Sequence, residues 1–334
     1  MIAKKFVVAA RPMGGLAKQD DFSLVEEELL NLCEGEILVR AEWFAVERFM
    51  LKRMEQIPIG AQMVGAQVAR VIDSRCPDFP VGTQVVGFFG WRDLTVYRVP
   101  SRGMESYFSM YEIPDLKGLH CTHAIGACGL TGISGYFAIQ KVFDPAPGET
   151  VVISTAAGAT GSVAGQVAKI RGCKVIGLAG TDDKVAWLKS AGFDHAINYK
   201  NTDLDETLRL VAPNGVDCYF ANNCQGGIVL MTVLKHMNSG GRIAYCTSNF
   251  NHGRNKQAVF DFETFVVKQI KMEAFVASRW IDEWFDTAEK IRDWILEGRI
   301  KVAETVKDGF ESLPQAMMDL FSSGKCLGKM IVKA

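Results

Sequence analysis

Residues 150–165 read TVVISTAAGATGSVAG, and this stretch decides the fold. A short β-branched run, typical of a buried parallel strand, leads into small residues and then into a helix predicted over 162–172. Gly158 and Gly161 would let the backbone approach a ligand, and Gly165 would let the helix pack closely on the sheet. A strand, a tight glycine turn and a helix direct N–H groups and the positive end of the helix dipole at a phosphate.

The spacing departs from the standard G-x-G-x-x-G pattern, because Ala156 stands where the first glycine would. Taken alone, the stretch is equally compatible with an ordinary strand-to-helix turn. The following segments favour a dinucleotide-binding domain, since strands and helices alternate as in a doubly wound parallel sheet. The further predicted strands cover 174–179, 195–199, 217–220 and 242–246, with a helix at 182–190.

Length and composition limit the class of protein. The chain has 334 residues, long for one compact unit, and 48% of them are hydrophobic, enough for a sizeable core. A net charge of −1 without long runs of one sign argues against nucleic-acid and membrane-surface partners. No stretch approaches the ~20 apolar residues of a membrane span. The N-terminus lacks a signal-peptide core, so we expect a cytoplasmic protein.

The cysteines and histidines do not form a recognisable metal site. The nine cysteines are scattered without a Cys-x-x-Cys pair, which favours reduced thiols over disulfides. Residues 120–123 read HCTH, which resembles a metal cluster. Neighbouring residues on a helix point in different directions, however, and no second spaced pair completes a tetrahedral set. We therefore predict no metal.

The segments around the nucleotide region predict a second domain. The first 125 residues are strand-rich, and from about residue 300 the chain is β-like again. A helix is expected from near Ala124 through Ile139. We predict a small β-barrel built from residues 1–125 and 300–334, interrupted by a nucleotide-binding domain over 126–299. The strands predicted for the barrel include 36–43, 60–73, 81–89 and 328–333.

The tip of the second predicted strand bears on the choice of nicotinamide cofactor. An NAD enzyme usually places Asp or Glu there, about 20 residues after the first glycine. Here the tip reads GLAGT over residues 177–181 and ends in small residues, and Asp182 and Asp183 come later, where acids also favour a helix start. Thr181 and Lys184 would suit a ribose 2′-phosphate, although Lys184 alone is equally explained as a surface lysine. The residues favour NADP(H).

Several segments distributed along the chain are specific when taken together: GLTG at 129–132, PGETVV at 147–152, AAGATGSV at 156–163, AGTDDKV at 179–185, NYK at 198–200, DCYF at 217–220, MEAF at 272–275 with RW at 279–280, LGK at 327–329 and IVKA at 331–334. Together they resemble a known family, the prostaglandin reductase (alkenal/one oxidoreductase) group of zinc-independent medium-chain dehydrogenases/reductases. The resemblance covers nearly the whole chain and implies an α/β fold, a GroES-like β-barrel plus a Rossmann domain with the cofactor between them. Zinc-dependent relatives carry a Gly-His-Glu motif, but residues 63–69 read MVGAQVA here.

The resemblance implies a reaction. NADPH would donate a hydride to the β-carbon of an α,β-unsaturated ketone or aldehyde, including oxo-prostaglandins, while charge develops on the carbonyl oxygen. A preorganised hydrogen-bond donor at that oxygen is usually the largest catalytic contribution. The resemblance further implies a homodimer and a place in lipid metabolism. Two alternatives remain open: an NADPH quinone reductase with the same fold, and a cofactor-binding homologue with little catalysis.

The resemblance also implies which residues bind the cofactor. Lys184 and Tyr199 would hold the 2′-phosphate, and Asn222 would lie near the ribose. The loop from Cys246 to His252 would cover the cofactor. The pyrophosphate would lie against Gly158, Ala159, Thr160 and Gly161, and the nicotinamide against Phe275, Val276 and Ala277.

The chain departs from the group at several positions. Residues 45–50 read AVERFM where the group has Val-Asp-Pro-Tyr-Met, so Phe49 replaces a tyrosine. Ser278 replaces another tyrosine and becomes the candidate catalytic donor, although a serine reaches less far. Ala221 replaces an aspartate, and Cys326 replaces an asparagine that contacts the cofactor. A lost donor costs about 2.7–4 kcal/mol, so these departures bear on the rate and on the substrate.

Overall fold

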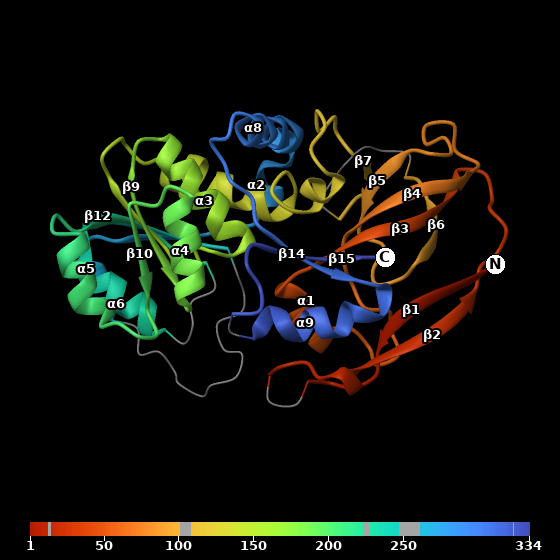
Figure 1. The fold of residues 1–334 in the computed structure, drawn as a ribbon, viewed down its shortest axis with the longest axis horizontal. Coiled ribbons are helices and arrows are strands. Elements are labelled where there is room, and N and C mark those ends of the chain that lie inside the picture. Colours follow the sequence, from red (N-terminus) through yellow and green to blue (C-terminus); the bar gives the residue numbers. More distant parts are fainter. Residues whose placement is uncertain (13–14, 101–107, 223–226, 247–260, 323) are drawn as a thin grey trace.

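The computed structural model describes residues 1–12, 15–100, 108–222, 227–246, 261–322 and 324–334. Figure 1 shows two units beside each other: a parallel sheet with helices on its faces, and a strand-rich unit that holds both chain termini. The C-terminal segment, drawn in blue, returns from the helical unit to the strands near the N-terminus.

The first unit is a six-stranded parallel sheet in the order β10-β9-β8-β11-β12-β13. This is the order expected of a doubly wound dinucleotide-binding fold, whose ligand crevice lies where the order reverses. The reversal falls between β8 and β11. The strands are β8 (Thr150–Ile153), β9 (Lys174–Ala179), β10 (His195–Asn198), β11 (Val216–Phe220), β12 (Met237–Tyr245) and β13 (Lys271–Ala274).

Helices cover both faces of this sheet, as alternating strands and helices require. All residues of β8 are buried, which explains its continuous apolar run. Helix α2 continues as a π-helix over Ala138–Phe143. The helices are α2 (Leu130–Phe137), α3 (Ala159–Ile170), α4 (Asp182–Ser190), α5 (Leu204–Val211), α6 (Ile228–His236), α7 (Phe262–Val267) and α8 (Trp284–Leu296).

The second unit is built on a mixed sheet in the order β14-β15-β3-β4-β5-β7, with β6 paired to β3. Strands β1 and β2 form a separate antiparallel pair. Its helices are α1 (Phe49–Gln56) and α9 (Leu313–Phe321). Its strands are β1 (Ile2–Val8), β2 (Phe22–Glu28), β3 (Glu36–Val46), β4 (Gln67–Ser74), β5 (Gln84–Gly87), β6 (Leu94–Arg98), β7 (Tyr111–Glu112), β14 (Glu304–Asp308) and β15 (Lys329–Lys333).

The last strand joins the two ends of the chain in one sheet. β15 runs antiparallel to β3, with Met330 opposite Val46. This pairing is expected if the barrel is interrupted by the nucleotide-binding domain and completed by the C-terminal segment. The domain boundaries at 125/126 and 299/300 stay a prediction.

Several predicted elements differ from the structure. The strand predicted at 60–73 begins only at Gln67, because Gly60 has φ +85° and lies in a turn. The strand predicted at 81–89 is shortened to β5, since Gly82 has φ +97°. The helix expected from near Ala124 begins at Leu130, after a 3₁₀ turn over Cys121–Ile125 that ends at Gly126.

The sequence indicated a β-like region from about residue 300. The structure differs, because α9 lies between β14 and β15. Pro314 stands in the first turn of α9, where a proline fits a helix. Leu313, Ala316 and Met317 form a buried face at helical spacing and pack into the barrel core. The prediction missed α9 because this helix has only nine residues and strands lie on both sides of it in the sequence.

A backbone contact joins the two units at the glycine turn between β8 and α3 (residues 154–158), called the cofactor turn below. The Gly328 N–H donates to the Ala157 carbonyl at 2.8 Å, and Gly158 and Gly328 form a parallel bridge. Gly328 has φ +68°, and a Cβ at this position would lie 1.8 Å from the Ala303 carbonyl oxygen. Only glycine fits here without movement of the backbone.

We predict that Gly328→Ala destabilises the protein more than Gly298→Ala. Both glycines have positive φ, which costs an alanine about 1–2 kcal/mol, but a Cβ at Gly298 would meet nothing within 4 Å. Gly328→Ala must also displace the Ala303 carbonyl. Urea unfolding midpoints of the two variants measure the difference, and equal midpoints would contradict the packing argument.

Candidate active site

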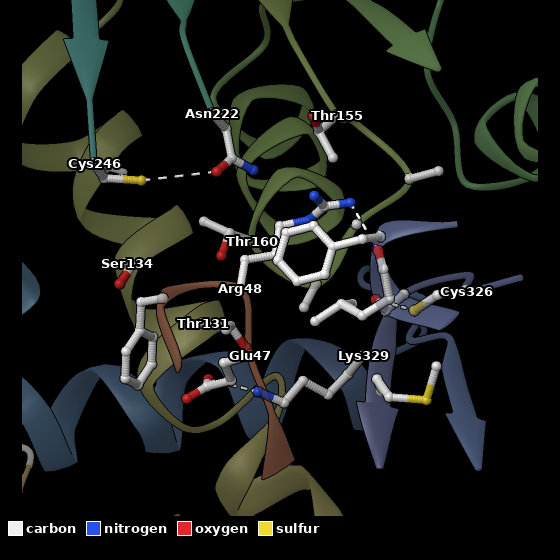
Figure 2. Close-up of a pocket in the computed structure, with 18 of the residues that line it drawn as sticks. Glu47, Arg48, Thr131, Ser134, Thr155, Thr160, Asn222, Cys246, Cys326 and Lys329 are labelled. Carbon is white, nitrogen blue, oxygen red and sulfur yellow. Dashed lines mark hydrogen bonds and ion pairs between the residues drawn. The ribbon is translucent and has the colours of Figure 1, made fainter. Parts of the chain in front are cut away.

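A cavity of about 950 Å³ lies between the cofactor turn and the strand-rich unit. It opens at the carboxyl ends of β8 and β11, where the topology places a ligand crevice. Segments of β3, α1, α9 and β15 form its other wall, and Figure 2 shows side chains from both units facing it. The predicted site residues that line it are Gly158, Ala159, Thr160, Lys184, Tyr199, Asn222, Cys246, Phe275, Val276, Ala277 and Cys326.

The glycine turn is shaped by close backbone contacts. Gly158 caps α3, so the N-terminus of that helix faces the cavity. Gly161 lies behind the turn, where a Cβ would come within 2.5 Å of the Thr155 carbonyl oxygen. The Ser154 hydroxyl contacts the Phe220 and Asn222 carbonyls at 3.0 Å each, which ties the end of β8 to the end of β11. The turn is therefore preformed for an anionic ligand.

The tip of β9 forms a positively charged end of the cavity. Lys184, Tyr199 and Lys200 line it together. A Cβ at Gly180 would lie 3.2 Å from the Tyr199 hydroxyl oxygen, so a larger residue at the tip would crowd this end. Burial raises the pKa of Tyr199, although the Arg48 charge lowers it, so the phenol keeps its proton as a donor.

The acid that follows this tip is engaged elsewhere. Asp182 accepts hydrogen bonds from the Asn198 and Asn201 side-chain amides at 2.7 and 3.2 Å. These bonds lower the pKa of Asp182, so it is ionised at neutral pH. Its carboxylate tethers α4 to the end of β10 and is not part of the cavity lining. An acid that would bind a ribose 2′-hydroxyl is thus missing from the described lining at this tip.

A buried ion pair lines the opposite wall and was not predicted. The Lys329 ammonium donates to Glu47 Oε1 at 2.6 Å, and the two side chains are 3% and 6% exposed. Glu47 Oε2 is also buried, and no hydrogen-bond partner for it is found among the described residues. The sequence carries no signal for this pair, because its members are 282 residues apart.

Near this pair the cavity wall is apolar. Phe49 lines the cavity and stacks on Phe88, with ring centroids 6.0 Å apart. The hydroxyls of Thr131 and Ser134, which also face the cavity, donate to the Gly126 and Leu130 carbonyls at 3.0 and 2.6 Å. Both hydroxyls thus have backbone partners within the start of α2.

Ser278 is not among the residues that line the cavity, although its neighbour Ala277 is. It lies half-buried in a 3₁₀ segment, Ala277–Glu283. The predicted loop from Cys246 to His252 lies outside the described residues beyond Cys246. The Cys246 thiol is 3.9 Å from Asn222 Oδ1, so these two predicted site residues meet at one end of the cavity (Figure 2).

Comparison with known proteins identifies the family. The chain is 38% identical to prostaglandin reductase 1 of Rattus norvegicus over 100% of both chains. This chain belongs to the zinc-independent medium-chain dehydrogenase/reductase family, in its prostaglandin reductase group. The 2-alkenal reductase (NADP(+)-dependent) of Nicotiana tabacum is 32% identical over 99% of this chain and 97% of its own. The sequence resemblance and the α/β fold class are confirmed.

Domain families and solved structures agree with this placement. Residues 4–104 match the N-terminal domain of oxidoreductase, and residues 159–293 match the family described as zinc-binding dehydrogenase. The crystal structure of CurA in complex with NADPH, from Vibrio vulnificus, superposes with a TM-score of 0.90 at 29% identity and 99% coverage of both chains. The chain is therefore an oxidoreductase of this fold.

The metal prediction concerns residues 120–123. His120 contacts the Thr122 hydroxyl, and His123 lies 3.8 Å from Glu304. In the described parts of the chain, no group of three or more His, Cys, Asp or Glu side chains is placed to hold a metal ion. Those parts also contain no helix that is long and apolar enough to cross a membrane.

We predict that Lys329→Met lowers stability by about 3–5 kcal/mol, because it leaves the Glu47 carboxylate buried without its partner. Arg209→Met is the matched control: Arg209 pairs with Asp205 on the surface, where such pairs contribute about 0–1 kcal/mol. Adding Glu47→Gln to Lys329→Met should recover much of the loss. Equal unfolding free energies for the two single variants would contradict the role given to the pair.

Proposed function

We propose that this protein reduces the C=C bond of α,β-unsaturated ketones and aldehydes with NADPH. The cavity carries the proposal, because it combines a glycine turn, the Lys184 and Tyr199 side chains and an apolar wall. The names of its relatives support it, since they include prostaglandin reductase 1, (+)-pulegone reductase and 2-alkenal reductase. The NADPH complex of CurA supports the choice of cofactor.

The described residues fit a dinucleotide. The N-terminus of α3 and the glycine positions at Gly158 and Gly161 leave the backbone open to a pyrophosphate. Lys184 and Tyr199 would hold the 2′-phosphate, and the engaged carboxylate of Asp182 leaves room for it. Remaining contacts to the ribose groups and the nicotinamide are proposed for Asn222, Cys246, Cys326, Phe275, Val276 and Ala277.

NADPH supplies the hydride that reaches the β-carbon of the substrate. The chain itself provides a wall that excludes water and orients the alkene, formed in part by Phe49 and the rings beside it. The carbonyl oxygen needs a donor as charge develops on it. Thr131 and Ser134 already donate their hydroxyl protons to backbone carbonyls, so neither is proposed as the donor to this oxygen.

One alternative function has its own support. Phe49 lacks the hydroxyl of the tyrosine it replaces, and Ser278 is outside the described cavity lining. A cofactor-binding protein with little catalysis would show both features. The quinone reductase alternative shares the fold, but the solved quinone oxidoreductases are only 14–17% identical, so they support the fold alone.

The deciding experiment follows NADPH oxidation by the purified protein. A medium-length enal, an oxo-prostaglandin-type enone and a quinone are each compared with a blank that lacks substrate. We expect oxidation with the enal or the enone. Oxidation with the quinone alone would establish the quinone reductase, and NADPH binding without any oxidation would establish the non-catalytic homologue.

Ser278 as the catalytic donor stays a prediction, and Ser278→Ala tests it. A hydroxyl that donates to the developing oxyanion contributes about 10²–10³ in kcat. If Ser278 is the donor, Ser278→Ala lowers kcat by that factor and leaves NADPH binding normal. A kcat close to that of the unchanged protein would remove Ser278 from this role, in agreement with its place outside the described cavity lining.

We also propose that the protein is a homodimer. β13 is the edge strand of the parallel sheet, and an exposed edge invites pairing with another chain. Val276, directly after β13, and Val266 on α7 are 60% and 76% exposed. Sedimentation analysis should give twice the chain mass, and Val266→Lys, outside the cavity lining, should shift it toward the monomer. A monomeric unchanged protein would end the proposal. The cytoplasmic location and the place in lipid metabolism stay predictions.

A further inference from the structure

Arg48 is a cation of the strand-rich unit that reaches into the cavity. It follows Glu47 and precedes α1. Its Nη2 donates to the Leu320 carbonyl at 2.9 Å, and its Cζ lies 4.8 Å from the centroid of the Phe321 ring. In Figure 2 the side chain extends toward the glycine turn, with Thr155 and Thr160 nearby in this view. The last turn of α9, whose carbonyls favour a cation, thus holds the guanidinium in place.

The contacts of Arg48 are neutral. Within the described ranges, its guanidinium has a carbonyl and an aromatic ring as partners and no carboxylate. The adjacent carboxylate of Glu47 pairs with Lys329 instead. Burial lowers the pKa of Arg48, and Cys326 and Tyr199 partly offset this effect. The side chain is half-buried and faces the cavity. Removing a cation from water without an opposite charge is unfavourable, so the arrangement fits an anion that binds from outside the chain.

Lys184 approaches the same space from α4. Burial lowers the pKa of Lys184; Cys326 raises it, and the positive charges of Arg48 and Lys200 lower it further. Cations from the two units therefore repel one another across the cavity. Asp182, two residues before Lys184, does not relieve this repulsion, because two asparagine side chains bind its carboxylate.

We propose that Arg48 binds the ribose 2′-phosphate of NADPH from the side opposite Lys184; this rests on NADPH being the cofactor, as proposed above. A phosphate dianion would remove the repulsion, and its oxygens match the planar donors of a guanidinium. Arg48, Lys184 and Tyr199 then form a phosphate clamp that joins the two units. NADH, which lacks the 2′-phosphate, would leave the repulsion in place.

The neighbours of Arg48 favour the 2′-phosphate over the pyrophosphate. Its partner Leu320 lies in the last turn of α9, and the chain just beyond α9 meets the tip of β9, where a Cβ at Gly324 would lie 3.7 Å from the Thr181 side chain. This tip is the end of the cavity that Lys184 and Tyr199 line, whereas the pyrophosphate is assigned to the turn at Gly158. The prostaglandin reductase group has a proline in the motif where this chain has Arg48. The clamp is therefore a property of this chain, and it should strengthen its preference for NADPH.

The test compares dissociation constants for NADPH and NADH, measured by calorimetry on the full chain. Arg48→Met removes the charge and keeps most of the stem, and Arg48→Lys restores a charge without the planar fork. Lys184→Met serves as the reference for the 2′-phosphate. Lys52→Met is the matched control, because Lys52 lines the same cavity but pairs with Glu55 at 2.6 Å. Melting temperatures show whether each variant is folded.

We expect Arg48→Met to weaken NADPH binding roughly 10- to 100-fold, the usual range for a hydrogen bond to a charged group, and to leave NADH binding unchanged. Arg48→Lys should recover part of the loss, and Lys52→Met should change neither constant. Arg48→Met combined with Lys184→Met should give a loss that differs from the product of the two single losses, since both side chains bind one phosphate.

Three results would overturn the proposal. Equal weakening of NADPH and NADH by Arg48→Met would move Arg48 to the pyrophosphate. Unchanged constants with a lower melting temperature would make Arg48 a structural partner of α9. NADPH selectivity that responds to Lys184→Met but not to Arg48→Met would remove Arg48 from the clamp while leaving the proposed cofactor intact. If the unchanged protein does not prefer NADPH to NADH, the proposed function itself fails.

Discussion

The ion pair between Glu47 and Lys329 holds together two segments of the strand-rich unit, one that lines the cavity and one that supports the glycine turn on its other side. The pair is almost fully buried, and a buried pair offsets the loss of hydration only if its geometry is close and constant. Glu47 is followed by Arg48 and Phe49, which line the cavity from the barrel side. Lys329 is preceded by Gly328, which contacts the cofactor turn. One ion pair therefore positions the wall and the segment that supports the turn.

The cavity has two ends of different character, each set by a different unit. Lys184 and Lys200 line the cavity where the parallel sheet ends, and Phe49, stacked on Phe88, lines the wall of the strand-rich unit. A ligand with a phosphate-bearing half and a flat, less charged half matches this division. The order of the strands explains its position, because the crevice lies where the sheet reverses its order between β8 and β11.

The sequence predicts the parallel sheet well and the far side of the cavity poorly. The β8 turn is local, so its small residues and β-branched run are sufficient to predict strand, turn and helix. Helix α9 was not predicted, because the residues that bury it lie in the barrel core, far away in the sequence. The Glu47 and Lys329 pair and the placement of Arg48 beside α9 depend on the tertiary fold alone. Motif similarity assigns cofactor roles by position, which stay a prediction, and it does not show that Ser278 lies outside the described cavity lining.

The bridge between Gly158 and Gly328 has a consequence for how this architecture can evolve. Its hydrogen bond runs from one main chain to the other, so it does not depend on which side chains the two partners carry. Recombination that exchanges the barrel between relatives would preserve this seam, provided that the hybrid keeps glycine at its crowded position. An insertion or deletion between Ala303 and Gly328 would shift the register of the seam instead. Segment length, more than sequence identity, therefore limits which hybrid enzymes can close their cofactor site.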